Sequence, residues 1–269
     1  MTVPETTTSR RGPLLAIVAL VVVVAGAAGL WYLFFRPAGP APVSLGTTPP
    51  IAAATATAES GSPSTAVDPS ASPSEAASPD GGTTSGIAGT WNVDPSVGSF
   101  ADFSSSFVGY RVQEELASVG ATEAVGRTPD VTGSLTVDGT TITAADFTAD
   151  LTTLVSDESR RDGQLRNQAL ETSQFPTASF TLTKPVELGS IPAEGQAVDV
   201  TATGDLTLHG VTKSVEIPMQ AKLENGVVTV VGTLPIVFAD YDIAKPTSFV
   251  VLSVDDNGVM EFQLHFTKA

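Results

Sequence analysis

The sequence predicts an all-β fold, an antiparallel barrel of about eight strands with one short helix, preceded by one transmembrane helix and a disordered linker. Three observations support this prediction. Apolar and polar residues alternate through most of residues 87–269, as they do in strands with one buried face. Pairs such as Asn225-Gly226 separate the alternating stretches and indicate tight hairpins. An uncharged run over residues 14–35 and a proline-rich segment come first in the chain.

Residues 14–35 are 22 residues without a charge, and about 20 apolar residues suffice to span a bilayer as a helix. The run exceeds the roughly 7–15 apolar residues of a signal peptide, although cleavage at the small residues 25–29 is the alternative. Arg10 and Arg11 precede the run, so residues 1–13 are expected to form a cytoplasmic tail. We therefore expect a single-pass signal-anchor protein of the plasma membrane, with the remaining chain outside the cytoplasm.

Residues 36–86 are rich in proline, alanine, serine and threonine, with nine prolines and no aromatic side chain. Such a composition cannot bury enough apolar surface to offset the chain entropy that folding removes. A flexible chain of this length has an end-to-end distance of roughly 40 Å. The segment is therefore expected to be a disordered stalk between the membrane and a folded domain over residues 87–269.

The composition excludes several classes of protein. The chain has no cysteine, which rules out disulfides, thiolate nucleophiles and cysteine metal ligands. Residues 87–269 contain 10 basic and 24 acidic side chains, which gives a net charge of −14. Nucleic-acid binding depends on basic groups that neutralise phosphates, so no nucleic-acid partner is expected.

The alternation places the elements of the domain along the chain. Strands are expected over residues 90–94, 108–112, 131–137, 141–151, 178–182, 198–208, 211–223, 228–238, 250–254 and 260–266. Turns are expected at Asp138-Gly139, His209-Gly210, Asn225-Gly226 and Asn257-Gly258. The apolar phase slips between Ala144 and Ala145, which predicts a β-bulge. The polar stretch 156–170 predicts a short surface helix capped by Ser156 or Asp157.

The interior of such a barrel is either filled by its own side chains or holds one small ligand, and alternation does not distinguish the two. His209 and His265 fall on the polar face, so both are expected to point outward, with His209 exposed at a hairpin tip; a base or a ligand contact is the alternative for His209. No metal cluster or nucleophilic triad is indicated, and the protein is not expected to be an enzyme. Arg160, Arg161 and Arg166 form the main positive cluster. They either pair with neighbouring acids on the helix or form a cationic rim for an anionic ligand head.

Three stretches resemble one family of proteins. SDESRRDGQLRNQAL at 156–170, QFPTASFTLT at 174–183 and GDLTLHGVTKSV at 204–215, in this order, are similar to the YceI-like family. The similarity covers roughly residues 90–269, and the sequence departs from the family's pattern at residues 238–243. The stretch SFVGYRVQEELASVG, which begins at Ser106, resembles actinobacterial members that carry an N-terminal membrane segment.

This resemblance implies a lipocalin-like barrel whose elongated apolar cavity holds a polyisoprenoid, such as an isoprenoid quinone or a polyprenyl phosphate. It implies a binding or carrier role, with no cofactor other than such a lipid. The expected partners are the lipid and the plasma membrane, through residues 14–35; a filled barrel that serves as an interaction or stress-response module is the alternative. The expected cavity-lining residues are Val108, Tyr110, Phe147, Phe180, Leu182, Val200, Leu206, Leu208, Val215, Ile217, Met219, Phe238, Phe262 and Leu264, and the head-group candidates are Arg160, Arg161 and Arg166.

Overall fold

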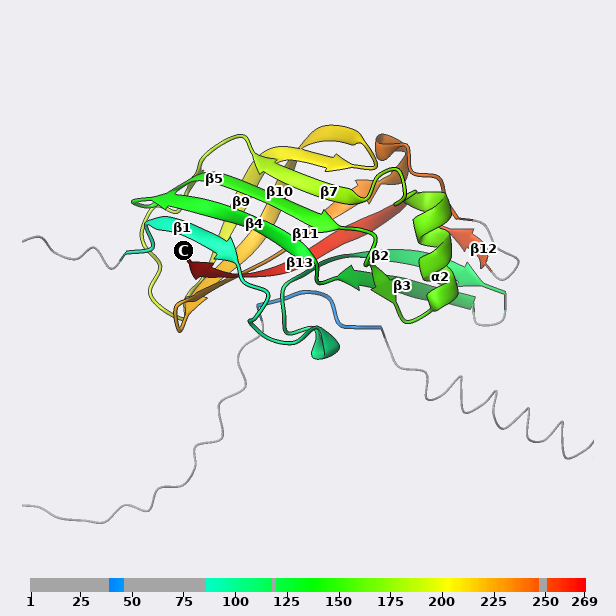
Figure 1. Ribbon diagram of the computed structural model, residues 1–269, viewed down its shortest axis with the longest axis horizontal. Helices are drawn as coiled ribbons and strands as arrows, with labels where there is room; N and C mark the ends of the chain where they lie inside the picture. The colour runs from blue at the N-terminus through cyan, green and yellow to red at the C-terminus, as the bar shows by residue number, and fades with distance from the viewer. Residues whose placement is uncertain (1–38, 46–85, 118–119, 247–250) are drawn as a thin grey trace, which may run out of the picture.

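The structure is a computed structural model that describes residues 39–45, 86–117, 120–246 and 251–269 (Figure 1). The predicted transmembrane helix and most of the predicted linker lie outside these residues. Within the described part of the chain, no helix combines the length and the apolar character needed to cross a bilayer.

The described domain consists almost entirely of strands. The strands are β1 (Gly89–Val93), β2 (Phe107–Leu116), β3 (Gly120–Thr128), β4 (Val131–Asp138), β5 (Thr141–Asp150), β6 (Val155–Ser156), β7 (Thr177–Leu182), β8 (Val186–Glu187), β9 (Ala197–Leu208), β10 (Val211–Glu224), β11 (Val227–Val237), β12 (Val251–Val254) and β13 (Asn257–Lys268). The helical segments are η1 (Phe100–Asp102), α2 (Ser159–Gln164), the π-helix η2 (Leu165–Ala169) and η3 (Phe238–Tyr241).

Eight of these strands close into a barrel. Their order is β1-β4-β5-β7-β9-β10-β11-β13, and β13 pairs back with β1. Every pairing around this ring is antiparallel. The predicted all-β barrel with one short helix is therefore confirmed.

One edge of β13 is shared between two strands. Residues 266–268 of β13 pair with β1, whereas residues 259–263 pair with β2, so β2 continues the line of β1. In the same way β3 continues β4, and β6 lies beside β3. β2, β3 and β6 thus lengthen the barrel wall at the end where α2 lies (Figure 1). β12 pairs with β2 off this ring.

The predicted bulge in β5 is present, slightly earlier than the sequence indicates. Thr136 pairs with Ala144 and Val137 pairs with Ile142, so Thr143 is the extra residue of the ladder. Thr143 and Ala144 are both exposed, while Ala145 is buried. The extra residue therefore produces the change of apolar phase that the sequence shows.

Two predicted boundaries are wrong. Asn257-Gly258 is not a turn, because Asn257 already pairs with Val237 at the start of β13. The cap of the helix is Glu158, whose carboxylate accepts a hydrogen bond from the backbone of Arg160, so neither Ser156 nor Asp157 is the cap. The Ser156 hydroxyl donates instead to a carboxylate oxygen of the buried Asp162, at 2.6 Å.

Two glycines in the wall let aromatic rings lie flat against the backbone inside the barrel. A Cβ atom at Gly204 would lie 2.4 Å from the Phe180 ring, and one at Gly232 would lie 2.5 Å from the Phe262 ring. Both rings fill the space that a larger residue would need. These close approaches shape the aromatic part of the interior.

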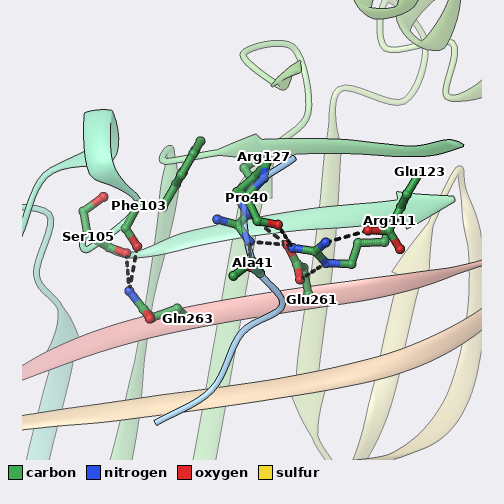
Figure 2. A network of polar contacts seen from close by, with 9 residues as sticks. All are labelled: Pro40, Ala41, Phe103, Ser105, Arg111, Glu123, Arg127, Glu261 and Gln263. Carbon is green, nitrogen blue, oxygen red and sulfur yellow. Dashed lines mark hydrogen bonds and ion pairs between the residues drawn. The ribbon is translucent and has the colours of Figure 1, made fainter. Parts of the chain in front are cut away.

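The outer face of β13 carries a buried ionic cluster. The Glu261 side chain is fully buried and accepts hydrogen bonds from Nε of Arg111 at 2.6 Å and from Nη2 of Arg127 at 2.7 Å (Figure 2). Nη1 of Arg111 also pairs with the half-exposed Glu123 at 2.8 Å. Burial lowers the pKa of Arg127, although its hydrogen bonds and attraction to Glu261 oppose the change. One carboxylate therefore holds two guanidinium groups from neighbouring strands.

We predict that Glu261→Ala lowers the free energy of unfolding by about 3–5 kcal/mol, because it leaves two buried guanidinium groups without their shared partner. The matched control is Glu123→Ala, which removes an exposed partner of the same Arg111 and should cost at most about 1 kcal/mol. Urea unfolding of the purified proteins, followed by near-ultraviolet circular dichroism, measures both values. Equal losses for the two variants would contradict a special role for the buried carboxylate.

Candidate functional site

The barrel encloses a first apolar cavity of about 170 Å³. Trp91 from β1, Phe147 from β5 and Phe180 from β7 contribute aromatic walls, and Ile217 and Phe262 close it from the opposite strands. Lys222 and Ser179 are polar residues on an otherwise apolar lining. A cavity with such walls favours hydrocarbon over polar ligands.

A second apolar cavity of about 130 Å³ lies at the end of the barrel that α2 and η2 cover. Leu165 and Leu170 from this helical segment and Leu208 from β9 are among its lining residues. The first and second cavities share three wall residues, which are Val108, Ala178 and Met260. The two cavities are therefore neighbours inside the barrel, with these three side chains between or beside them.

The second cavity has a charged margin. Arg161 lines it and pairs through Nη2 with Glu114 and through Nη1 with Asp157, each at 2.5 Å. Burial disfavours the charged guanidinium, but hydrogen bonds and attraction from Glu114 and Asp157 outweigh this and raise the pKa of Arg161. The side chains of Arg161 and Glu114 are only 14% and 6% exposed. This end of the interior therefore carries fixed charges, whereas Lys222, which pairs with Glu224 at 2.8 Å, is the charged residue in the lining of the first cavity.

Tyr110 adds a neutral hydrogen-bonding group to the second cavity. Its hydroxyl is buried, and no residue within the described ranges hydrogen-bonds to it. Burial raises the pKa of Tyr110 against the opposing charge of Arg161, with smaller contributions from Asp162, Glu114 and Asp157, so the hydroxyl stays protonated. An unpaired buried hydroxyl costs free energy until it finds a partner. It is available to donate to an oxygen of a bound molecule.

The structure brings most of the sequence-predicted lining residues to the cavity walls, and Val215 is the exception, since it packs against the core without lining either cavity. Whether these residues contact a ligand stays a prediction. The first cavity takes Val108, Phe147, Phe180, Leu182, Val200, Leu206, Ile217, Met219, Phe262 and Leu264, and the second takes Tyr110, Leu208 and Phe238, with Val108 in both.

The three head-group candidates are placed differently. Arg161 lines the second cavity, Arg160 is exposed, and Arg166 donates through Nη1 to the carbonyl oxygen of Leu154 at 3.3 Å. The arginines therefore do not act as one cluster. Their role toward a ligand head stays a prediction, and the geometry favours Arg161.

Sequence reasoning missed part of the second cavity. Glu114 lies in a polar stretch after the expected strand 108–112, so it was not predicted to line a cavity. The helix was expected to lie on the surface and not to cover an apolar space. Leu165 and Ala169, four residues apart and therefore on one helical face, were the available signal that this segment covers an apolar surface.

The expectation that His209 is exposed is wrong. His209 is buried, its Nδ1 lies 3.0 Å from the carbonyl oxygen of Tyr241, and its Nε2 lies 3.2 Å from a carboxylate oxygen of Glu171. The Phe175 ring lies against it, with 4.4 Å between the ring centroids. His209, in the turn after β9, thus contacts η3 on one side and the loop that follows η2 on the other.

His265 points out of the barrel as expected, but it is buried beneath the segment that precedes β2. Its Nε2 lies 2.8 Å from the carbonyl oxygen of Ser104, and its Nδ1 lies 2.9 Å from the Thr229 hydroxyl. Burial lowers the pKa of His265, although the Ser104 carbonyl and Asp94 oppose the change. Within the described residues, no group of three or more His, Cys, Asp or Glu side chains is arranged to hold a metal ion.

The closed antiparallel barrel, its elongated apolar interior and the helix over one end define the class of lipocalin-like barrels with an internal cavity. The family model of the YceI-like domain matches residues 91–266. The chain belongs to this family.

Several known proteins are similar to this chain. Protein YceI of Escherichia coli O157:H7 is 34% identical over 121 residues, which are 44% of this chain and 56% of that protein. Protein YceI of Salmonella arizonae is 31% identical over 144 residues, or 52% of this chain and 65% of that protein. The chain thus matches little more than half the length of the Escherichia coli relative.

A solved structure supports the fold. It is a polyisoprenoid binding domain from Saccharophagus degradans implicated in plant cell wall breakdown, with a TM-score of 0.50 and 16% sequence identity. The match covers 66% of this chain and 98% of that one. At this identity the likeness shows a shared fold.

We predict that His265 makes stability fall in mildly acidic solution. The pKa of His265 is lowered in the folded protein, so below its unfolded value of about 6.5 the unfolded chain binds the proton more tightly. The stability that neutral His265 contributes to the folded protein is therefore intact above about pH 6.5, the unfolded pKa, and is lost as pH falls through the folded pKa. Urea unfolding at pH 7.5 and pH 5 should show a smaller loss for His265→Gln than for wild type, because both carry the same carboxylates. An equal loss in the two proteins would contradict this role.

Proposed function

We propose that this protein is a membrane-tethered binding protein that holds an isoprenoid lipid, a quinone or a polyprenyl phosphate, in its barrel and is not an enzyme. The observation that carries the proposal is the pair of neighbouring apolar cavities that share Val108, Ala178 and Met260 as lining residues. A long, narrow, apolar interior suits a flexible hydrocarbon chain better than a compact ligand. The polyisoprenoid binding domain with the same fold supports this choice of ligand class.

The two ends of the interior assign an orientation to the lipid. The first cavity is almost wholly apolar and suits the isoprenoid tail. The lining of the second cavity includes Tyr110 and Arg161, whose hydroxyl and guanidinium suit the oxygen atoms of a quinone or a phosphate head. Glu114 and Asp157 already neutralise Arg161, so a neutral head gains from Tyr110 while an anionic head must compete with these carboxylates.

The membrane tether explains how such a lipid reaches the barrel. Residues 14–35 form an uncharged run of the length that spans a bilayer, and the arginines before it favour a cytoplasmic N-terminus. The barrel then lies outside the cytoplasm, beside the membrane in which the lipid resides.

Protease added to intact cells should release a soluble barrel fragment, and protection until the membrane is opened would contradict this orientation.

We predict that solvent extraction of the purified protein yields an isoprenoid lipid that mass spectrometry identifies. Ala178→Leu enlarges a side chain shared by both cavities and should reduce the lipid recovered per protein, at a cost to stability of about 1–3 kcal/mol. Ala144→Leu is the matched control, because Ala144 is exposed on β5, and it should retain the lipid. Extracts of wild type without any isoprenoid would instead favour a ligand-free interaction or stress-response module.

We predict that Tyr110→Phe weakens binding of a quinone or a polyprenyl phosphate about threefold to tenfold, the value of one neutral hydrogen bond. The ligand-free variant should be as stable as wild type or more stable, because it loses a buried hydroxyl without a partner in the described chain. Arg160→Gln, which changes an exposed arginine, should bind as wild type does. Lipid titration and thermal unfolding of the delipidated proteins measure these effects. A less stable Tyr110→Phe with unchanged affinity would show that the hydroxyl is structural.

A further inference from the structure

The outer wall of the barrel carries a groove that is separate from the two cavities. Val125 and Arg127 of β3 lie beneath it, and Phe103 and Phe107 flank it. The guanidinium of Arg127 lies over both rings, 4.6 Å from the centroid of Phe103 and 4.1 Å from that of Phe107. The groove therefore combines aromatic surface with a buried positive charge that Glu261 holds in place.

The chain's own residues 39–44 form one side of this groove, far in sequence from the barrel that they contact. Nη2 of Arg111 donates to the carbonyl oxygen of Pro40, and Nη2 of Arg127 donates to that of Ala41 at 2.9 Å (Figure 2). Each arginine thus bonds Glu261 and the segment at once, because its Nη2 donates to both and its Nε donates to Glu261 alone.

The outer side of β3 is covered, and the segment contributes part of that cover. The last five residues of β3, 124–128, are all buried, although alternate side chains of a barrel wall normally face solvent. A Cβ atom built at Gly39 would lie 3.4 Å from a methyl carbon of Val125, an ordinary packing distance. Residues 39–45 therefore protect the outer face of this strand.

The recognition is mainly through the backbone of the segment. The side chains of Ala41 and Pro42 are exposed, while the carbonyl groups of Pro40 and Ala41 face the arginines. Prolines at 40 and 42 restrict the unbound chain, which lowers the entropy lost on docking. An aromatic groove that holds an extended, proline-containing peptide is a recurring mode of recognition.

We propose that residues 39–45 are a strap that binds the outer groove of its own barrel and sets the length of the tether. The chain is also fixed after the linker, where Lys268 donates to the carbonyl oxygen of Gly86 and the Trp91 indole donates to that of Ile87. Residues 46–85 then join two points on the same barrel and add nothing to the distance between barrel and membrane.

The consequence for membrane distance rests on the proposed tether. Four residue steps separate Phe35, the last residue of the apolar run, from Gly39 in the strap. Fully extended, they span at most about 14 Å, compared with roughly 40 Å for a flexible stalk of the whole linker. The strap would hold the barrel close to the surface from which its lipid comes.

Disulfide trapping in the full chain tests the strap without reference to the membrane. The natural sequence has no cysteine, so Gly39→Cys with Val125→Cys introduces the only pair. The Cβ atom built at Gly39 lies 4.0 Å from Cβ of Val125, within the range of disulfides. The control is Ser70→Cys with Val125→Cys, whose cysteines are closer in sequence. Oxidised glutathione starts the reaction, and maleimide-polyethylene glycol counts the remaining thiols.

We expect the Gly39/Val125 double variant to form its disulfide at least about tenfold faster than the control, because docking raises the effective concentration above that of a flexible linker. Equal rates would overturn the proposal. A second measurement uses Val125→Cys alone: replacing residues 39–45 by a Gly-Ser sequence should increase its labelling by maleimide at least about tenfold. Unchanged labelling would also overturn the strap. Both results stand whether or not the barrel binds a lipid.

Discussion

The structure depends on the way in which β13 closes the ring. A single edge of this strand pairs with β1 over residues 266–268 and with β2 over residues 259–263. Closure satisfies the backbone groups of both end strands and separates the interior from water. The apolar cavities exist only because this wall is continuous. The split also leaves room for residues 94–106, between β1 and β2, to fold back over the outside of β13, where Ser104 contacts His265.

The two faces of β13 have opposite chemistry as a result. Phe262 and Leu264 face the first cavity, whereas Glu261, Gln263 and His265 face outward and are covered by neighbouring segments. Gln263 donates to the carbonyl oxygens of Phe103 and Ser105, which ties the covering segment to the wall (Figure 2). Both faces of such a strand are shielded from solvent, so its polar side chains need hydrogen-bond partners from the protein.

The sequence located strands best where one face of the strand is buried and the other is exposed to solvent. The alternation located β4, β7, β9, β10 and β11, and the change of phase in β5 indicated its bulge. It did not indicate β3, because residues 124–128 are all buried: the inner face borders the second cavity and the outer face lies partly beneath a segment far away in sequence. Asn257-Gly258 resembled a turn, yet pairing with β11 holds Asn257 in a strand. Local signals do not report contacts of this kind.

The candidate site was predictable in part for the same reason. Inward phase placed most of the lining residues, such as Phe180 and Phe262, on cavity walls. The alternation of apolar residues does not report the volume of the barrel interior, so it did not show that the barrel contains cavities. It also did not separate Arg161, which lines the second cavity, from its exposed neighbour Arg160. That difference arises from the way α2 packs on the barrel end.

The proposed attachment of the chain at residues 39–45, together with its contact at Gly86, has a consequence for tolerance to insertion. Because both ends of the intervening segment are fixed to one body, a change in its length alters only the entropy of closing a loop. Doubling such a loop costs about 0.6 kcal/mol. With the proposed membrane anchor at residues 14–35, the forty residues of this segment could lengthen, shorten or acquire bulky modifications with little effect on the distance between barrel and membrane, which the few residues before Gly39 would set.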